Sequence, residues 1–202
     1  MIPRYPAADQ RNVDVSNGLV RVHSCSPAML SRADIEMTSI TALLHTKDDA
    51  LRLGRALETL YACDDILVVD HGSRDATVRV ARAYGARIVD DRPGAALADY
   101  LRLTPNPANP GWLLCLDPHE SLSEKLAASL FEWKSDSFHV EGPSASAFSV
   151  FLREETAEGW LEVPAAQTRL VPQTWNLWKG TFPVHEPSAV ALQGELLRFI
   201  FP

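Results

Sequence analysis

Short apolar runs alternate with amphipathic segments between residues 38 and 135, which predicts strands that alternate with helices. The apolar runs are bounded by polar residues and have the length of buried strands. They span residues 39–44, 66–69, 86–89 and 112–116. This alternation is typical of an α/β protein with a mostly parallel, doubly wound sheet.

Apolar residues recur at helical spacing after the first two runs. The stripes consist of Leu53, Ala56, Leu57 and Leu60 in the first predicted helix and of Val78, Ala81 and Tyr84 in the second. We expect Gly85 to end the second helix in a left-handed conformation. After the fourth run, Ser121 and Glu124 have the spacing of a capping box, which predicts a helix that begins there. A further helix is predicted over residues 95–103 of a proline-rich connection.

The second half of the chain has a different pattern. Residues 147–152 predict a strand, and a charged loop follows at residues 154–159. Trp160, Trp175 and Trp178 then fall in segments rich in Pro, Gly and Thr. This part therefore predicts an irregular C-terminal lobe of short strands that packs on the sheet.

These patterns divide the chain into an extension and one domain. We expect an N-terminal extension over residues 1–37 and a domain over residues 38–202. Within the domain, residues 38–135 form the α/β half and residues 136–202 the irregular lobe. A chain of 202 residues, of which 46% are hydrophobic, suffices for one α/β core.

The charge and cysteine content exclude some classes of protein. A net charge of −7 provides no basic field for nucleic acid. No apolar run reaches the roughly 18 residues of a transmembrane helix, and the N-terminus lacks the apolar core of a secretory signal. Three cysteines suit neither a zinc site nor a disulfide framework. We therefore expect a reduced, cytoplasmic protein.

Polar residues follow three of the predicted strands, at residues 46–49, 70–73 and 117–120. Ligands of open parallel sheets bind beyond the carboxyl ends of the strands, so three such loops at one edge predict a binding site. The alternative is that each loop only caps the helix that follows, because Asp, Ser and Thr suit that position as well.

Residues 40–90 resemble the start of family 2 glycosyltransferases, through a strand, the loop Thr46-Lys-Asp-Asp49 and the sequence Val68-Val-Asp-His-Gly-Ser-Arg-Asp-Ala-Thr77. Residues 112–126 resemble the family's strand and D-x-D segment. Arg169-Leu170 and residues 178–186 are similar to its downstream features. The resemblance covers roughly residues 38–190, and the branch that it resembles contains lipopolysaccharide-core β-glucosyltransferases.

The resemblance implies a GT-A fold that binds a nucleotide-diphosphate sugar donor. The residues that it assigns to the nucleotide are Thr46, Asp48, Asp70, Gly72 and Ser73, with Asp70 accepting a hydrogen bond from the base. It places a divalent metal, Mn or Mg, at Asp117 and His119, and it places His185 and Glu186 near the donor phosphates or the acceptor, as the candidate catalytic pair.

The chain departs from the family's pattern in two places. His119 stands where the second Asp of D-x-D is usual, and imidazole suits manganese less well than zinc or other transition metals. Glu120 is an alternative ligand on the next residue. Residues 98–100 lack the Arg-Asn pair that family members carry before the fourth strand.

The resemblance predicts an inverting, metal-assisted hexosyltransferase that acts on a cell-envelope glycan or a lipid-linked acceptor. The two departures favour an alternative, a degenerate member that binds nucleotide or glycan without turnover. The catalytic base stays open between the His185–Glu186 pair and the charged loop at residues 154–158. A location at the inner face of the membrane also stays open. A Rossmann dinucleotide enzyme is disfavoured because no G-x-G-x-x-G follows the first strand.

Overall fold

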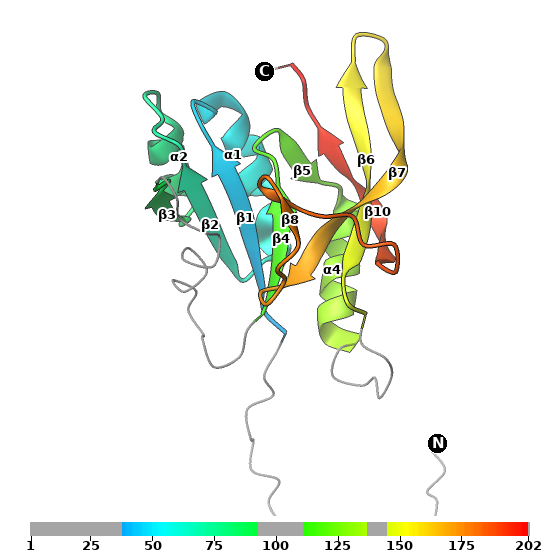
Figure 1. The fold of residues 1–202 in the computed structure, drawn as a ribbon. Coiled ribbons are helices and arrows are strands. Elements are labelled where there is room, and N and C mark those ends of the chain that lie inside the picture. The colour runs from blue at the N-terminus through cyan, green and yellow to red at the C-terminus, as the bar shows by residue number, and fades with distance from the viewer. Residues whose placement is uncertain (1–37, 93–110, 137–144, 202) are drawn as a thin grey trace, which may run out of the picture. The chain divides into compact units, whose positions relative to one another are not determined.

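An eight-stranded sheet with the strand order β3-β2-β1-β4-β7-β6-β10-β5 forms the centre of the protein (Figure 1). The computed structural model describes residues 38–92, 111–136 and 145–201. The predicted extension over residues 1–37 and the predicted helix over residues 95–103 lie outside these ranges. The strands are β1 (Ile40–Thr46), β2 (Asp65–Asp70), β3 (Arg87–Asp90), β4 (Trp112–Leu116), β5 (Glu120–Leu122), β6 (Phe148–Thr156), β7 (Gly159–Pro172) and β10 (Val190–Arg198), with β8 (Trp178–Lys179) and β9 (Phe182–Pro183) in a separate pair.

β1 lies in the middle of a parallel half of the sheet. It pairs in parallel with β2 and with β4, and β2 pairs in parallel with β3. Four of the seven pairings described in the large sheet are parallel. The α/β class and the mostly parallel sheet are therefore confirmed. The carboxyl ends of β1 and β2 meet at the same edge, where Thr46 lies opposite Asp70.

Alternate residues of the buried strands face opposite sides of the sheet. Ile40, Ala42 and Leu44 belong to one core cluster, and Leu43 belongs to another on the far side. The helices are α1 (Ala50–Glu58), the 3₁₀ turn η1 (Leu60–Ala62), α2 (Thr77–Ala83) and α4 (Glu124–Asp136). Their buried apolar residues all join the cluster of Ile40.

The far face is covered differently. Among the described residues, Trp175, Trp178 and Phe182 pack against the cluster of Leu43. Figure 1 shows β8 in front of the sheet, with α1 and α4 behind it. None of the described helices has the length and the apolar character that a membrane span requires.

The second half of the chain differs from the expected lobe of short strands. β6, β7 and β10 contain nine, 14 and nine residues, and they extend the same sheet. The first half of β7 is largely exposed, and only Thr168–Val171 are buried. Because a strand that projects beyond its core carries no sustained apolar alternation, its length was hidden in the sequence.

The ends of two helices test the predicted boundaries. Gly85 has a φ of 74°, so the left-handed residue after α2 is confirmed. The capping box at Ser121 is wrong, because Ser121 lies in β5 and α4 begins at Glu124. Ser123 caps the helix instead: its Oγ accepts a hydrogen bond from the backbone N–H of Leu126.

Gly194 allows β10 to pass directly against α4. Its φ is 95°, and a Cβ at this position would overlap the backbone of Leu126. We expect Gly194→Ala to lower the free energy of unfolding by about 3 kcal/mol, the sum of left-handed strain and overpacking. Urea unfolding measures this loss. Gly159→Ala is the matched control, because Gly159 also has a positive φ but no atom within 4 Å of the added Cβ. Equal losses in the two variants would contradict the close approach.

Candidate functional site

The loops after β1 and β2 are tied together by reciprocal hydrogen bonds. The backbone N–H of Asp48 donates to Ser73 Oγ at 2.9 Å, and the backbone N–H of Arg74 donates to Asp48 Oδ1 at 2.6 Å. Asp48 is exposed and has a φ of 55°. The structure therefore brings together Asp48 and Ser73, two of the residues expected at the nucleotide.

Asp70 shapes the second loop. It is 5% exposed, and its Oδ2 accepts hydrogen bonds from the backbone N–H groups of Gly72 and Ser73 at 3.2 and 3.0 Å. Its Oδ1 accepts one from Ser73 Oγ. Gly72 has a φ of 82°, which favours glycine at this turn. The carboxylate of Asp70 thus holds the turn that presents Gly72 and Ser73.

Asp49 organises the first loop, although it was not among the residues expected to contact the nucleotide or the metal. Its Oδ2 accepts hydrogen bonds from Thr46 Oγ1 at 3.0 Å and from the backbone N–H of Lys47 at 2.9 Å. Its Oδ1 lies 3.2 Å from His119 Nε2. The signal available in the sequence was the three-residue spacing of Thr46 and Asp49, which brings their side chains together in a tight turn.

The loop after β4 carries the residues expected at the metal. The backbone N–H of His119 donates to Asp117 Oδ1 at 2.9 Å, and His119 Nδ1 lies 3.5 Å from the same oxygen. The His119 ring therefore lies between Asp117 and Asp49. Over the described ranges, no group of three or more His, Cys, Asp or Glu side chains is arranged to hold a metal ion.

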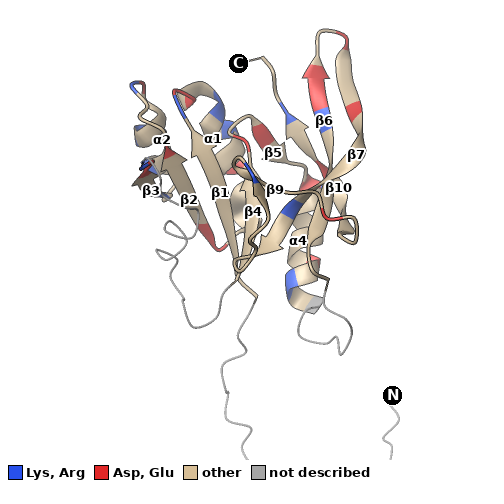
Figure 2. Cartoon of the chain, viewed as in Figure 1, with Lys and Arg blue, Asp and Glu red and all other residues tan. Residues whose placement is uncertain are grey.

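Glu120 belongs to a buried ion-pair network. It is fully buried, and its Oε1 accepts hydrogen bonds from Arg169 at 2.8 Å and from Arg198 at 2.7 Å. Its Oε2 accepts one from the backbone N–H of Asp117 at 2.9 Å. Figure 2 shows acidic positions on β5 and β6, where Glu120 and the second partner of Arg198, Glu154, lie. Glu120 thus positions the loop. Its side chain does not face the metal position, so the expectation that Glu120 is an alternative metal ligand is wrong.

We expect Arg169→Met to lower the free energy of unfolding by about 3–5 kcal/mol, because it removes one of two cations from a buried carboxylate. Burial lowers the pKa of Arg169, and Glu120 opposes that shift. Urea unfolding provides the measurement. Glu154→Gln is the control: Glu154 is 30% exposed, so the loss should stay within about 1 kcal/mol. A small effect of Arg169→Met would show that the pair is not needed for stability.

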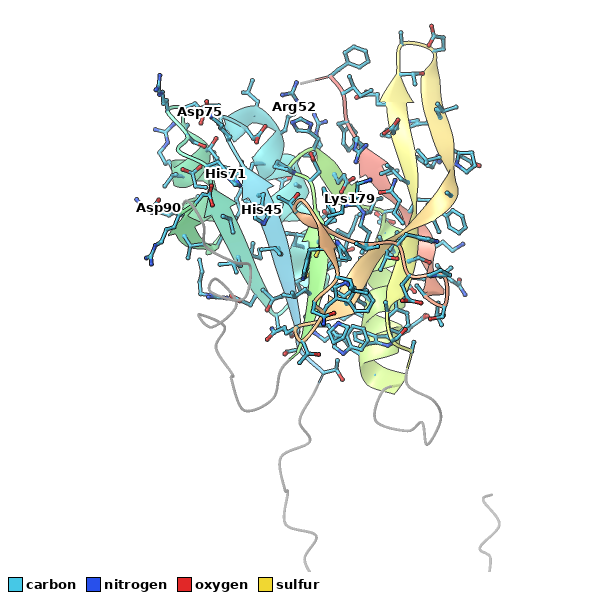
Figure 3. The ribbon with its side chains drawn as sticks, in the orientation of Figure 1. His45, Arg52, His71, Asp75, Asp90 and Lys179 are labelled. Carbon is cyan, nitrogen blue, oxygen red and sulfur yellow. The ribbon has the colours of Figure 1, made fainter. Side chains whose placement is uncertain are left out.

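Three side chains form a hydrogen-bonded chain across the ends of β1, β2 and β3. His71 Nδ1 lies 2.9 Å from Asp91 Oδ2, and His71 Nε2 lies 3.0 Å from His45 Nδ1. Figure 3 shows His45 and His71 at neighbouring strand ends. His45 Nε2 is buried and has no hydrogen-bond partner. Burial, and then the neighbouring His71, lower the pKa of His45 to about 4. No sequence motif marked this chain.

The lowered pKa of His45 predicts a loss of stability in acid. Between the ordinary pKa of 6.5 and the folded value of about 4, the unfolded chain binds the proton and the folded chain does not. The free energy of unfolding should therefore fall by about 2 kcal/mol from pH 7 to pH 4.5 through His45 alone. Urea unfolding at both pH values measures this fall in the free energy of unfolding. The part due to His45 should be absent in His45→Gln and present in the control His185→Gln. Equal losses in all three proteins would refute the assignment.

His185 and Glu186 occupy different surroundings. His185 is exposed and lines a cavity of about 300 Å³. Other residues that line it are Gln167, Thr168, Arg169, Phe182 and Pro183. The carboxylate of Glu186 instead accepts hydrogen bonds from the hydroxyl and backbone N–H of Ser188, and these lower its pKa. Arg169 also donates to the carbonyl of Cys115, so the cavity lies beside the end of β4.

The chain is similar in sequence to proteins described as glycosyltransferases. One, from Rickettsia felis, is 31% identical over 91 residues, which are 45% of this chain and 32% of that protein. A TPR repeat-containing protein of Synechococcus elongatus is 30% identical over 124 residues, 61% of this chain and 29% of its own length. The similarity to the protein from Rickettsia felis confirms the resemblance to glycosyltransferases. The chain spans about a third of the length of the relatives it matches, and no family model matches it.

Solved structures that the chain partly matches include residues 1–349 of TarS from S. aureus, at 15% identity and a TM-score of 0.42, covering 63% of this chain and 38% of that one. A second is glucosyl-3-phosphoglycerate synthase from Mycobacterium tuberculosis, in complex with Mn²⁺, UDP and glucosyl-3-phosphoglycerate. It is 20% identical with a TM-score of 0.37, covering 58% and 43% of the two chains.

Proposed function

We propose that this chain carries the donor site and an acceptor site of a glycosyltransferase with a GT-A fold, which transfers a sugar from a nucleoside diphosphate to a hydroxyl acceptor. The observation that carries the proposal is the joining of three strand-end loops at one edge of the parallel half-sheet. Asp48 contacts Ser73, and Asp49 contacts His119, so the loops after β1, β2 and β4 form one surface. The similarity to proteins described as glycosyltransferases supports the same assignment.

The nucleotide would lie on the loops after β1 and β2. Asp48 is an exposed carboxylate there and offers an acceptor to the hydroxyl or N–H groups of a nucleoside. Thr46 and Asp70 are buried and already hydrogen-bonded, so they would set the shape of the two loops together with the turn at Gly72 and Ser73. This division of roles supports base and ribose recognition by a preformed surface.

The loop of Asp117 and His119 would hold a divalent metal together with the diphosphate. Carboxylate oxygen suits manganese, and manganese tolerates an imidazole nitrogen beside it, so this donor set can hold the ion. A metal bound there supplies charge that neutralises the departing nucleoside diphosphate. Because carboxylates on two loops face His119, the residues present fit such an ion.

The acceptor would enter the cavity beside the end of β4. Phe182 and Pro183 provide apolar walls, and Gln167 and His185 provide polar groups. We propose His185 as the base that removes the proton of the acceptor hydroxyl, in a single inverting displacement. Glu186 would hold the backbone next to it, since its own N–H donates to Thr168 Oγ1 at 2.9 Å and its carboxylate is bound to Ser188. A cell-envelope glycan or a lipid-linked sugar remains our proposal for the acceptor.

A cytoplasmic location is part of the same proposal. Cys63 and Cys115 are free thiols, and burial raises the pKa of each to about 12. Thiols so protected suit a reducing compartment, where a soluble nucleotide-sugar donor is also at hand. Contact with the inner face of a membrane would bring the site to a lipid-linked acceptor.

The second candidate is a degenerate binding module without turnover. It is favoured by one observation, the contact of His119 with Asp49, in which two polar side chains satisfy each other. The two candidates share the nucleotide site and differ in donor cleavage.

Calorimetric titration of the whole chain with UDP, GDP and their sugars, with and without Mn²⁺, tests the proposal. We expect one nucleotide to bind, and Asp48→Asn to weaken it by about tenfold through a lost charged hydrogen bond. Glu132→Gln, an exposed change on α4, should leave the affinity unchanged. Absence of binding for every nucleotide would overturn the proposal. Binding without hydrolysis or transfer of any donor sugar would favour the degenerate module.

A further inference from the structure

We propose that Asp49 Oδ1 and His119 Nε2 are the protein ligands of the divalent cation, and that Asp117 orients the imidazole instead of binding the ion. The inference rests on the proposed function, because the donor diphosphate would complete the coordination. It changes the ligand pair from two residues of one loop to one residue from each of two loops, after β1 and after β4.

The separation of the two candidate ligand atoms suits one ion. Asp49 Oδ1 and His119 Nε2 lie 3.2 Å apart. Two ligands at about 2.1 Å from one octahedral ion, at a right angle to each other, lie about 3 Å apart. Only a small adjustment of either side chain is therefore needed for both atoms to contact the same cation.

Asp117 lies on the opposite side of the ring. His119 Nδ1 is 3.5 Å from Asp117 Oδ1, and that oxygen also accepts the backbone N–H of His119. A histidine that binds a metal through one nitrogen commonly directs its other nitrogen to a carboxylate, which sets the tautomer and the ring orientation. Without an ion, Nε2 donates a hydrogen bond to Asp49. A proton placed on Nδ1, beside Asp117, would free the lone pair of Nε2 for a cation held together with Asp49.

Asp49 is held in place before any ion arrives. Thr46 Oγ1 and the backbone N–H of Lys47 both donate to its Oδ2, which leaves Oδ1 directed at His119. The side chain of Asp49 is 16% exposed, so the carboxylate is accessible at one edge and fixed at the other. A carboxylate anchored through one oxygen loses little conformational freedom when its second oxygen binds a cation.

With two protein ligands, most coordination positions of the ion are left for the diphosphate and for water, as is usual for cations bound together with phosphates. The cation should therefore bind weakly to the protein alone and more tightly with UDP. One nitrogen ligand also predicts a preference for Mn²⁺ over Mg²⁺.

Pulsed electron paramagnetic resonance of Mn²⁺ on the whole chain, with UDP, tests the ligand pair. We expect nitrogen coupling to Mn²⁺ in the unaltered protein and its loss in His119→Gln. Asp117→Asn should keep the nitrogen coupling and lower the affinity for Mn²⁺ by about 10–100-fold, as changes to an orienting carboxylate do. Asp49→Asn should lower the affinity for Mn²⁺ by more than Asp117→Asn does. In Asp49→Asn the new side chain keeps a carbonyl oxygen that can accept the backbone N–H of Lys47. Unfolding curves of this variant and of the unaltered protein should therefore show the same stability.

Several outcomes would overturn the ligand pair. Bound Mn²⁺ without nitrogen coupling would do so, and so would loss of Mn²⁺ in Asp117→Asn with full binding in Asp49→Asn. UDP binding that is unaffected by Mn²⁺ would also reject it while leaving the proposed donor site intact. Failure of UDP and all other nucleotides to bind would instead overturn the proposed function. Glu132→Gln serves as the control and should match the unaltered protein in every measurement.

Discussion

The buried carboxylate of Glu120 is the point on which the two halves of the molecule depend. A fully buried charge is tolerated only when it is paired and hydrogen-bonded. Glu120 forms ion pairs and accepts hydrogen bonds from Arg169 on β7 and from Arg198 on β10. Its second oxygen accepts the N–H of Asp117. One side chain on β5 thus connects two strands of the second half to the loop that follows β4. The same contacts decide where that loop can lie.

This network also sets the charge at the edge of the sheet. Arg198 pairs with Glu154 as well as with Glu120, so two cations and two anions balance within the network. Asp48, Asp49 and Asp117 lie outside it, and the edge that they share is acidic. An acidic edge does not attract a diphosphate by itself, because like charges repel. The combination of carboxylates with an imidazole therefore suits a cation that mediates between the protein and the phosphates.

Much of the parallel half followed from the sequence because its signals are local. The four apolar runs at β1 to β4 became strands. β1, β2 and β4 are buried, and a buried strand needs little more than a short apolar run between polar ends, whereas β3 is a half-exposed strand at the edge of the sheet. Gly85 marked the end of α2 through its own backbone freedom. The predicted cap of α4 was two residues too early, because Ser121 and Ser123 each carry a hydroxyl that can cap a helix. Which serine caps the helix depends on the pairing of β5 with β10, which places Ser121 in a strand.

The candidate site was predicted less completely, because a position in the chain does not reveal which atoms of a side chain are free. Asp48 and Ser73 were expected together and do meet, whereas Asp49 was overlooked beside its exposed neighbour. The sequence by itself determined the class of fold, the three polar strand ends and the resemblance to glycosyltransferases. Only the tertiary structure decided that Asp49 faces His119, that Glu120 turns inward and that β6, β7 and β10 extend one sheet. The physical reason is that these outcomes depend on contacts between residues about 40 to 80 positions apart, whose free energies become available only when the chain has folded.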